Sequence, residues 1–241
     1  MSVLTTIAPA SGRTHASKVT ETSASGDPFA RARNKLLDSI VVNTGIDDPR
    51  ILGAFAKVPR HLFVPESQRM AAYQDRALPI GEEQTISQPS MIAIMLMELD
   101  PQPTDRALEV GGGSGYAAAL LAELVGEVDA IELRPELAQR AARTLRDLGY
   151  ENVKVHVADG SRGLPERAPF DEILVSAAAR EMPEALLAQL AAGGRIAVPI
   201  GSQFEQTLVV GQRDPSGGFS FRTSTSCVFV PLVTPNQPFA S

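Results

Sequence analysis

One stretch decides the fold: Ala107-Leu-Glu-Val-Gly-Gly-Gly-Ser-Gly-Tyr116. Apolar residues run into a cluster of glycines, and an alanine- and leucine-rich helical pattern follows at once. This order predicts a β-strand, a tight turn and a helix, which together open a nucleotide-binding α/β unit. Glycines have no Cβ, so the turn can come close to a ligand, and the first amides of the helix point toward it.

Strand and helix patterns alternate along the chain from residue 105 onward. The expected strands and helices are, in order, 106–110, 116–124, 128–132, 135–148, 153–158, 170–175, 183–191 and 195–199. This alternation predicts a mostly parallel, doubly wound sheet with helices on both faces. Two further β patterns, 206–212 and 219–230, flank the turn sequence Asp214-Pro-Ser-Gly-Gly218, so we expect the sheet to end in antiparallel strands.

The first hundred residues follow different patterns. Residues 1–26 are rich in Ser, Thr and Ala, and we expect a disordered tail. Apolar residues then recur at helical spacing over 29–41, 49–58 and 90–99. Proline and glycine at both ends of residues 78–89 predict a loop there.

These patterns predict one domain after the tail. We expect it to span 27–241, with a helical cap and substrate loop at 27–104 and a ligand-binding sheet at 105–241.

The composition disfavours several kinds of partner. The net charge is -6, which argues against nucleic acid, since phosphate binding leaves a basic footprint. The single cysteine, Cys227, excludes a disulfide framework and a cysteine metal cluster, and it fits a reducing cytoplasm. No apolar run approaches the roughly 20 residues that span a bilayer. We therefore expect a cytoplasmic protein without a metal and without nucleic-acid or membrane partners.

Three acidic residues fall at or just after the predicted strand ends: Glu109, Glu132 and Asp159. In a doubly wound sheet, ligands bind beyond the carboxyl ends of the strands. Each acid alone is a common turn residue. Three of them in register beside a glycine turn predict an adenosine-type ligand, with Glu132 near the usual offset for an acid that meets ribose hydroxyls.

The turn narrows the choice of ligand. It has neither a nearby lysine nor the phosphate-binding spacing Gly-x-x-x-x-Gly-Lys-Ser/Thr, and the dinucleotide spacing Gly-x-Gly-x-x-Gly is also missing. The pattern Glu-x-Gly-x-Gly-x-Gly is typical of S-adenosylmethionine-dependent methyltransferases. A carboxylate near the turn suits the cationic sulfonium and amino group of that ligand.

The chain resembles the protein-L-isoaspartate O-methyltransferase family from about residue 31 to residue 233. The segments that carry the resemblance are Val58-Pro-Arg-His-Leu-Phe-Val-Pro65, Ala72-Tyr-Gln-Asp75, Leu78-Pro-Ile-Gly81, Gln84-Thr-Ile-Ser-Gln-Pro89, Leu108-Glu-Val-Gly-Gly-Gly-Ser-Gly-Tyr116, Leu148-Gly-Tyr-Glu-Asn-Val153, Asp159-Gly160, Ala168-Pro-Phe-Asp171, Ala177-Ala-Ala179, Gly193-Gly-Arg195, Pro199-Ile-Gly201 and Val228-Phe-Val-Pro-Leu232. The loop Thr-Ile-Ser-Gln-Pro followed by the glycine turn is far more specific than the turn alone.

The resemblance implies a Rossmann-like methyltransferase sheet with an N-terminal helical cap, in a monomer that uses S-adenosylmethionine. The implied activity is methyl transfer to the α-carboxyl of L-isoaspartyl and D-aspartyl residues in damaged proteins and peptides. The ester then closes to a succinimide, and hydrolysis returns part of the chain to normal aspartyl. By position, Ser87 is the implied active-site serine. The implied cofactor contacts are Thr85, Ile86, Glu109, Gly111, Gly113, Ser114, Glu132, Leu133, Asp159, Gly160 and Gln206.

This chemistry requires few catalytic groups from the protein. A carboxyl with a reference pKa of about 3.5–4 is already ionised at neutral pH, so no general base is needed. We expect Ser87 to donate a hydrogen bond that orients the substrate carboxylate or the cofactor, and not to act as a covalent nucleophile. Neither His61 nor His156 is needed as a base.

Four residues depart from those usual in the family, near the expected peptide groove: Ala77, Ser90, Ser176 and Cys227. They leave a second hypothesis open, a peptide-tailoring enzyme that methylates an ordinary aspartate in one dedicated partner peptide. A third hypothesis is a non-catalytic S-adenosylmethionine-binding module, although such a module would be expected to have lost Ser87 or Glu109.

Overall fold

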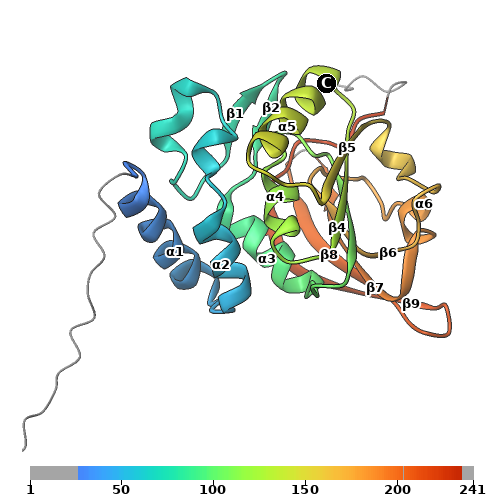
Figure 1. Ribbon diagram of the computed structural model, residues 1–241. Helices are drawn as coiled ribbons and strands as arrows, with labels where there is room; N and C mark the ends of the chain where they lie inside the picture. Colours follow the sequence, from blue (N-terminus) through green and yellow to red (C-terminus); the bar gives the residue numbers. More distant parts are fainter. Residues whose placement is uncertain (1–26, 203, 235–241) are drawn as a thin grey trace, which may run out of the picture.

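The computed structural model describes residues 27–202 and 204–234, so the tail expected at 1–26 lies outside the described residues. Its main feature is a seven-stranded sheet with the order β5-β4-β3-β6-β7-β8-β9 (Figure 1). The strands are β3 (Arg106–Val110), β4 (Glu127–Glu132), β5 (Val153–Val157), β6 (Phe170–Val175), β7 (Leu190–Gly201), β8 (Gln206–Arg213) and β9 (Phe219–Cys227).

The strand directions confirm the predicted fold class. Strands β3 to β7 pair in parallel with their neighbours, and β8 and β9 are antiparallel. The helices after β3, β4 and β6 are α4 (Tyr116–Ala122), α5 (Pro135–Asp147) and α6 (Glu184–Leu187). This is the Rossmann-like arrangement, in which the carboxyl ends of the parallel strands share one edge of the sheet.

Alternate strand residues face two separate cores. Ala107 packs with α3 (Pro89–Leu99), α4 and α5, whereas Leu108 and Val110 pack on the opposite face. That second face is covered by the short α6 and by the 3-10 helix η3 (Gly160–Arg162) with its flanking loop. The β3 strand is thus buried on both sides, as its apolar sequence predicts.

A helical cap precedes the sheet, as expected. It consists of α1 (Ala30–Thr44), α2 (Pro49–Lys57), η1 (Arg60–Leu62), η2 (Glu66–Ala71) and α3. Helix α2 begins with Pro49, and the Asp48 side chain accepts a hydrogen bond from Arg50 N at 2.8 Å. Helix α3 is apolar nearly all round because it is buried between α1 and the sheet.

The prediction of a loop over 78–89 is wrong for its first three quarters, residues 78–86. The segment forms a β-hairpin, β1 (Leu78–Gly81) and β2 (Gln84–Ile86), turned by Glu82 and Glu83 at φ 53° and 57°. Leu78 and Ile80 point into the core while Pro79 faces out. This alternation is the strand signal in the sequence, and the proline and glycine obscured it.

The predicted helix 183–191 is also too long, because the chain returns to the sheet early. Strand β7 begins at Leu190, which is fully buried opposite Phe170, so the glycine pair that suggested a helix stop lies inside the strand. A Cβ on Gly194 would lie 2.9 Å from Asp171 O, so only glycine fits this close approach. The last strand ends at Cys227, and Pro231 then forms an isolated bridge with Ala178.

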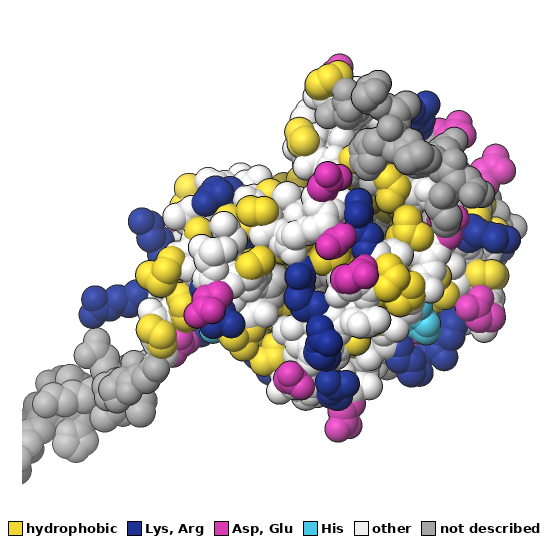
Figure 2. All heavy atoms as spheres, turned by 90° about the horizontal axis from the view of Figure 1, so that it is seen from above, with side chains coloured by type: hydrophobic (Ala, Val, Ile, Leu, Met, Phe, Trp, Pro, Cys, Tyr) yellow, Lys and Arg dark blue, Asp and Glu magenta, His cyan; other side chains and the backbone are white. Residues whose placement is uncertain are grey.

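Within the described residues, no helix combines the length and the hydropathy needed to cross a bilayer. Figure 2 shows the molecule from above, the side on which the hairpin and α5 lie in Figure 1. Lysine and arginine side chains are interspersed with acidic ones on this face.

Candidate active site

The glycine turn after β3 has the backbone that its sequence predicts. Gly111 and Gly113 have φ values of 84° and 49°, in the left-handed region that disfavours any residue with a Cβ. Gly111 N and Gly112 N both donate to Ile131 O, at 2.9 and 2.8 Å, which ties the turn to β4. The turn therefore presents backbone, not side chain, to the edge of the sheet.

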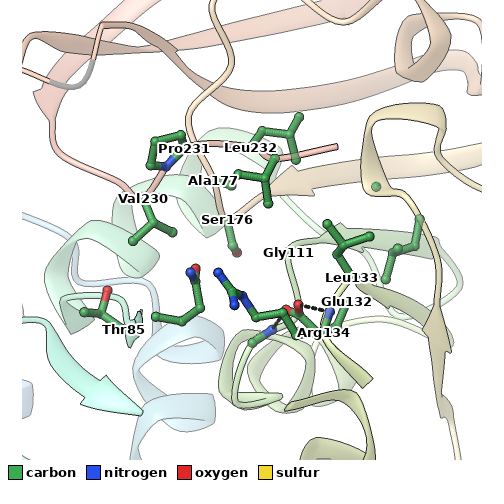
Figure 3. Close-up of a pocket in the computed structure, with 15 residues that line it drawn as sticks. Thr85, Gly111, Glu132, Leu133, Arg134, Ser176, Ala177, Val230, Pro231 and Leu232 are labelled. Atoms are coloured by element: carbon green, nitrogen blue, oxygen red, sulfur yellow. Dashed lines mark hydrogen bonds between the residues drawn. The ribbon is translucent and has the colours of Figure 1, made fainter. Parts of the chain in front are cut away.

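Glu132 ends β4 and is only 6% exposed. Its two carboxylate oxygens each accept one backbone hydrogen bond at 2.8 Å, Oε2 from Gly113 and Oε1 from Arg134 (Figure 3). The carboxylate is thereby fixed in place against the glycine turn. Each oxygen keeps a further acceptor position for a ligand donor.

A small pocket of about 50 Å³ opens beside Glu132 and the turn. In Figure 3, Thr85 and Val230 lie on one side of it, and Glu132 and Leu133 on the other. Of the predicted cofactor contacts, the residues that line it are Thr85, Gly111, Gly113, Glu132, Leu133 and Gly160. Lining residues that were not assigned to the cofactor are Gln84, Ile131, Arg134, Ser176, Ala177 and 230–233.

A large cavity of about 550 Å³ lies next to the small pocket. It holds Ser87 and Gln206, and also three of the departures from the family pattern, Ala77, Ser176 and Cys227. Gln206 is tied down by its own amide, which donates to Phe229 O at 3.0 Å and accepts from Phe229 N at 2.7 Å.

The small pocket and the large cavity share a wall. Thr85, Ser176 and Val230 line both of them. These residues come from the hairpin, from the end of β6 and from the segment after β9, three places far apart in the sequence. A molecule in the small pocket and one in the large cavity would meet across this wall.

Glu109 lies beneath the site and reaches it through a neighbour. It is 1% exposed, its Oε1 accepts from Ser176 Oγ at 3.1 Å, and its Oε2 has no hydrogen-bond partner among the described residues. Burial raises the pKa of Glu109 to about 8; the Ser176 hydrogen bond opposes the rise, and the negative charge of Glu132 adds to it. A nearby cation would be stabilised by the ionised form of this carboxyl.

Besides Glu109, three predicted contacts line neither space. Ile86 is 3% exposed in the core, and Ser114 Oγ accepts from Tyr116 N at 3.3 Å at the start of α4. Asp159 accepts from Ser161 N at 3.0 Å and from Ser161 Oγ at 2.7 Å, which caps the 3-10 turn after β5. Their assignment as cofactor contacts stays a prediction.

Ser90 differs in position from the other departures. It is 6% exposed, its backbone N donates to Asp75, and its hydroxyl accepts from the Gln88 amide. It lies at the start of α3 and does not line the large cavity. Ser90 therefore acts on the groove through the chain before it, not by contact.

Arg134 is the lining residue that sequence reasoning missed most plainly. Its guanidinium lies 3.8 Å from Glu82 on the hairpin turn, and the side chain enters the small pocket. The signal was present, because Arg134 follows Glu132 at the same strand end. The segment 230–233 offered no such signal, since only its pairing with Ala178 brings it to the site.

The small pocket has the groups that a cationic nucleoside needs, but not yet the room. A Cβ on Gly160 would lie 2.7 Å from Val110 Cγ1, so glycine is required at that edge. The volume of about 50 Å³ is far below the roughly 300 Å³ of an ordinary ligand pocket. Binding a nucleoside-sized ligand therefore requires lining side chains to move, and the long, partly exposed Arg134 is the one best able to do so.

Comparison with known proteins assigns the family. The family model of protein-L-isoaspartate (D-aspartate) O-methyltransferase matches residues 31–237. The protein-L-isoaspartate O-methyltransferase of Roseiflexus sp. (strain RS-1) is 51% identical over 207 residues, which cover 85% of this chain and 93% of the relative. That of Aeropyrum pernix is 47% identical over 211 residues, covering 86% and 81%.

Solved structures agree with the sequence comparison. A protein-L-isoaspartate O-methyltransferase superimposes with a TM-score of 0.74 at 32% identity, covering 84% of this chain and 66% of that one. A putative protein-L-isoaspartate O-methyltransferase from Plasmodium falciparum, in complex with S-adenosyl-L-homocysteine, also gives a TM-score of 0.74, at 25% identity and with coverage of 83% and 98%.

Proposed function

This chain belongs to the protein-L-isoaspartate (D-aspartate) O-methyltransferase family and is an S-adenosylmethionine-dependent repair enzyme, and we propose that its two adjoining spaces divide the reaction between them. The small pocket beside the glycine turn holds the methyl donor. The large cavity with Ser87 receives the isoaspartyl residue of a damaged protein or peptide.

The shared wall is the observation that supports this division. Methyl transfer requires the carboxylate oxygen, the methyl carbon and the sulfur to lie in line, with the donor and acceptor side by side. Thr85, Ser176 and Val230 line both spaces, so a ligand on one side of them adjoins a ligand on the other.

The cofactor supplies a methyl group from its sulfonium and leaves as a neutral thioether. The substrate carboxylate is ionised at neutral pH and needs no base, which fits a site that neither His61 nor His156 lines. Ser87 donates a hydrogen bond that orients the carboxylate. The work of this chain is therefore positioning and exclusion of water, which can lower a barrier by roughly 7–11 kcal/mol.

We assign the cofactor contacts as follows. Glu132 accepts from the ribose hydroxyls with the acceptor positions that its backbone bonds leave free. Gly111, Gly113 and Gly160 give the close approach, and Glu109 balances the positive charge from below. Thr85 and Leu133 line the same pocket, and Ile86, Ser114, Asp159 and Gln206 remain assigned by position in the family pattern.

The two other hypotheses from the sequence are not favoured. The family match spans residues 31–237, and both Ser87 and Glu109 are present. Neither a tailoring enzyme with one dedicated peptide nor a non-catalytic binding module is needed to explain them.

We further propose that residues 27–241 act as one domain and as a monomer in the cytoplasm, without nucleic-acid or membrane partners. The net charge of -6 and the single cysteine support this proposal. Light scattering on the purified chain checks the oligomeric state.

A methyl-acceptor assay tests the function. The chain is expected to methylate a peptide with an isoaspartyl residue and to leave its normal aspartyl twin unmodified. Ser87→Ala should lower kcat by about 100-fold, since one orienting hydrogen bond in a dry site is lost, with cofactor affinity unchanged. Ser39→Ala, at a partly exposed serine on α1 that lines neither space, is the matched control. Equal methylation of both peptides would contradict the repair function, and unchanged kcat in Ser87→Ala would contradict the role of that serine.

A further inference from the structure

Arg60 has a charged side chain that is buried in the core, next to the loop that carries Ser87. It is 0% exposed, and within the described residues its hydrogen bonds go only to backbone carbonyls, not to a carboxylate. Burial of a charge without a charged partner is costly, so such a group is poorly explained by stability alone. Its contacts indicate another role.

Those contacts join two walls of the large cavity. Arg60 Nη2 donates to Ser87 O at 2.9 Å and to Arg76 O at 3.3 Å, and Nε donates to Ala72 O at 2.8 Å. Arg76 directly precedes Ala77, which lines the cavity as Ser87 does. One planar guanidinium thus fixes the backbone on which Ser87 is carried.

Arg60 also touches the donor side of the site. Its Cζ lies 4.8 Å from the centre of the Tyr116 ring, and Tyr116 is 1% exposed. Tyr116 is the first residue of α4, directly after the glycine turn. A cation over a desolvated aromatic ring is held more strongly than one at a surface.

Asp75 also holds the loop that carries Ser87. It accepts from Ser90 N at 2.8 Å and from Gln88 Nε2 at 3.2 Å, so the chain just after Ser87 is fixed by the same segment that Arg60 binds. Arg60 holds the Ser87 carbonyl, and Asp75 holds Gln88 and Ser90. Ser87 therefore has little freedom to shift.

We propose that Arg60 is a positioning residue, a buried guanidinium that fixes Ser87 relative to the glycine turn and so aligns the acceptor carboxylate with the methyl donor. The inference rests on the proposed function, because it acts through Ser87. Methyl transfer is sensitive to this alignment, since a shift of about 1 Å in a reacting group can cost roughly 100-fold in rate.

The experiment compares Arg60→Met, Arg60→Lys and Ser87→Ala in the full-length chain with an isoaspartyl peptide. Arg60→Met is expected to lower kcat by about 30-fold while the Kd of S-adenosylmethionine and the peptide KM change by less than about threefold. Arg60→Lys keeps the charge but cannot reach all three carbonyls, and should restore part of kcat. Arg33→Met is the matched control, because Arg33 also contacts the cap through Tyr73 but does not reach Ser87.

A double-mutant cycle separates positioning from a general structural role. In a Ser87→Ala background, Arg60→Met should lower kcat by less than about threefold more, because the group that it positions is gone. An undiminished 30-fold loss in that background would overturn the proposal, as would unchanged kcat in Arg60→Met. If Arg60→Met does not fold, Arg60→Lys decides: lowered kcat with retained cofactor affinity supports the proposal, and unchanged kcat overturns it.

Failure of the proposed function gives a different result. Absence of isoaspartyl methylation by the unaltered chain, or unchanged kcat in Ser87→Ala, would remove the function or the serine's role and the Arg60 inference with it. Loss in Ser87→Ala combined with unchanged kcat in Arg60→Met overturns the Arg60 inference alone.

Discussion

The small pocket and the large cavity adjoin, yet they are built differently. The small pocket is lined mainly by residues at the carboxyl ends of the parallel strands β3, β4, β5 and β6, with the hairpin and residues 230–233 on its other side. The large cavity is formed by the hairpin and its continuation into α3 and by the segments 204–206 and 226–230, which lie outside the parallel strands. The cofactor is the same in every turnover, whereas damaged peptides differ. A rigid frame suits the first ligand, and side chains on connecting segments suit the second.

The largest expected effect is on cofactor affinity, and it comes from a substitution that alters the small pocket alone. Glu132→Ala removes the carboxylate that anchors Gly113 and that we assign to the ribose, so the Kd of S-adenosylmethionine should rise about 100-fold. Isothermal titration calorimetry measures it, and the exposed Glu136→Ala serves as control. A change of less than threefold would show that the frame, not Glu132, binds the cofactor.

The next effect concerns the charge below the small pocket. The folded-state pKa of Glu109, about 8, lies above its unfolded value, so its contribution to stability is full below about pH 4.5 and is lost as the pH rises through 8. Between pH 6 and 8, the cofactor-free chain should therefore lose about 2 kcal/mol of unfolding free energy that Glu109→Gln retains. Urea unfolding of both proteins at several pH values measures the difference. Parallel pH profiles for the two proteins would rule out a protonated Glu109.

A smaller effect is expected on the KM of peptides that bind the large cavity. Phe204 and Val228 line it and are 83% and 79% exposed, so they offer apolar surface to whatever flanks the isoaspartyl residue. Phe204→Ser should raise the KM of a peptide with a leucine neighbour about fivefold and leave a serine-flanked peptide unaffected. Met70→Ser, also highly exposed but outside the cavity, is the control. Equal changes for both peptides would contradict an apolar rim.

The smallest effect is expected at Cys227. Burial raises the pKa of its thiol to about 11, so the thiolate is scarce at neutral pH. Cys227→Ala should change kcat and KM by less than about twofold, and iodoacetamide should label the thiol slowly at pH 7.5. Rapid labelling with loss of activity would instead make Cys227 a sensitive part of the cavity.

The same contrast explains what the sequence could predict. The sheet, the glycine turn and Glu132 follow from local patterns, because strand, turn and strand-end acid are neighbours in the chain. The hairpin at Leu78–Gly81 and Gln84–Ile86 was missed because proline and glycine obscured a short alternation. The glycine turn and strand-end acid of the small pocket were therefore predictable, whereas its hairpin wall was not.

The rest depends on contacts between distant residues. Ser176 meets Glu109 across 67 positions, and Pro231 reaches the site by pairing with Ala178. Arg60 binds Ser87 through a carbonyl, which no residue type reveals. Such contacts are decided by packing of the whole chain, so the outline of the large cavity required the structure.

The wall formed by Thr85, Ser176 and Val230 has a thermodynamic consequence. Any shift of these side chains on binding one ligand changes the surface offered to the other, so the two affinities are coupled. Linkage requires reciprocity: the factor by which cofactor alters peptide affinity must equal the factor by which peptide alters cofactor affinity. Departure of the thioether product would accordingly change the affinity for the methylated peptide through the same wall.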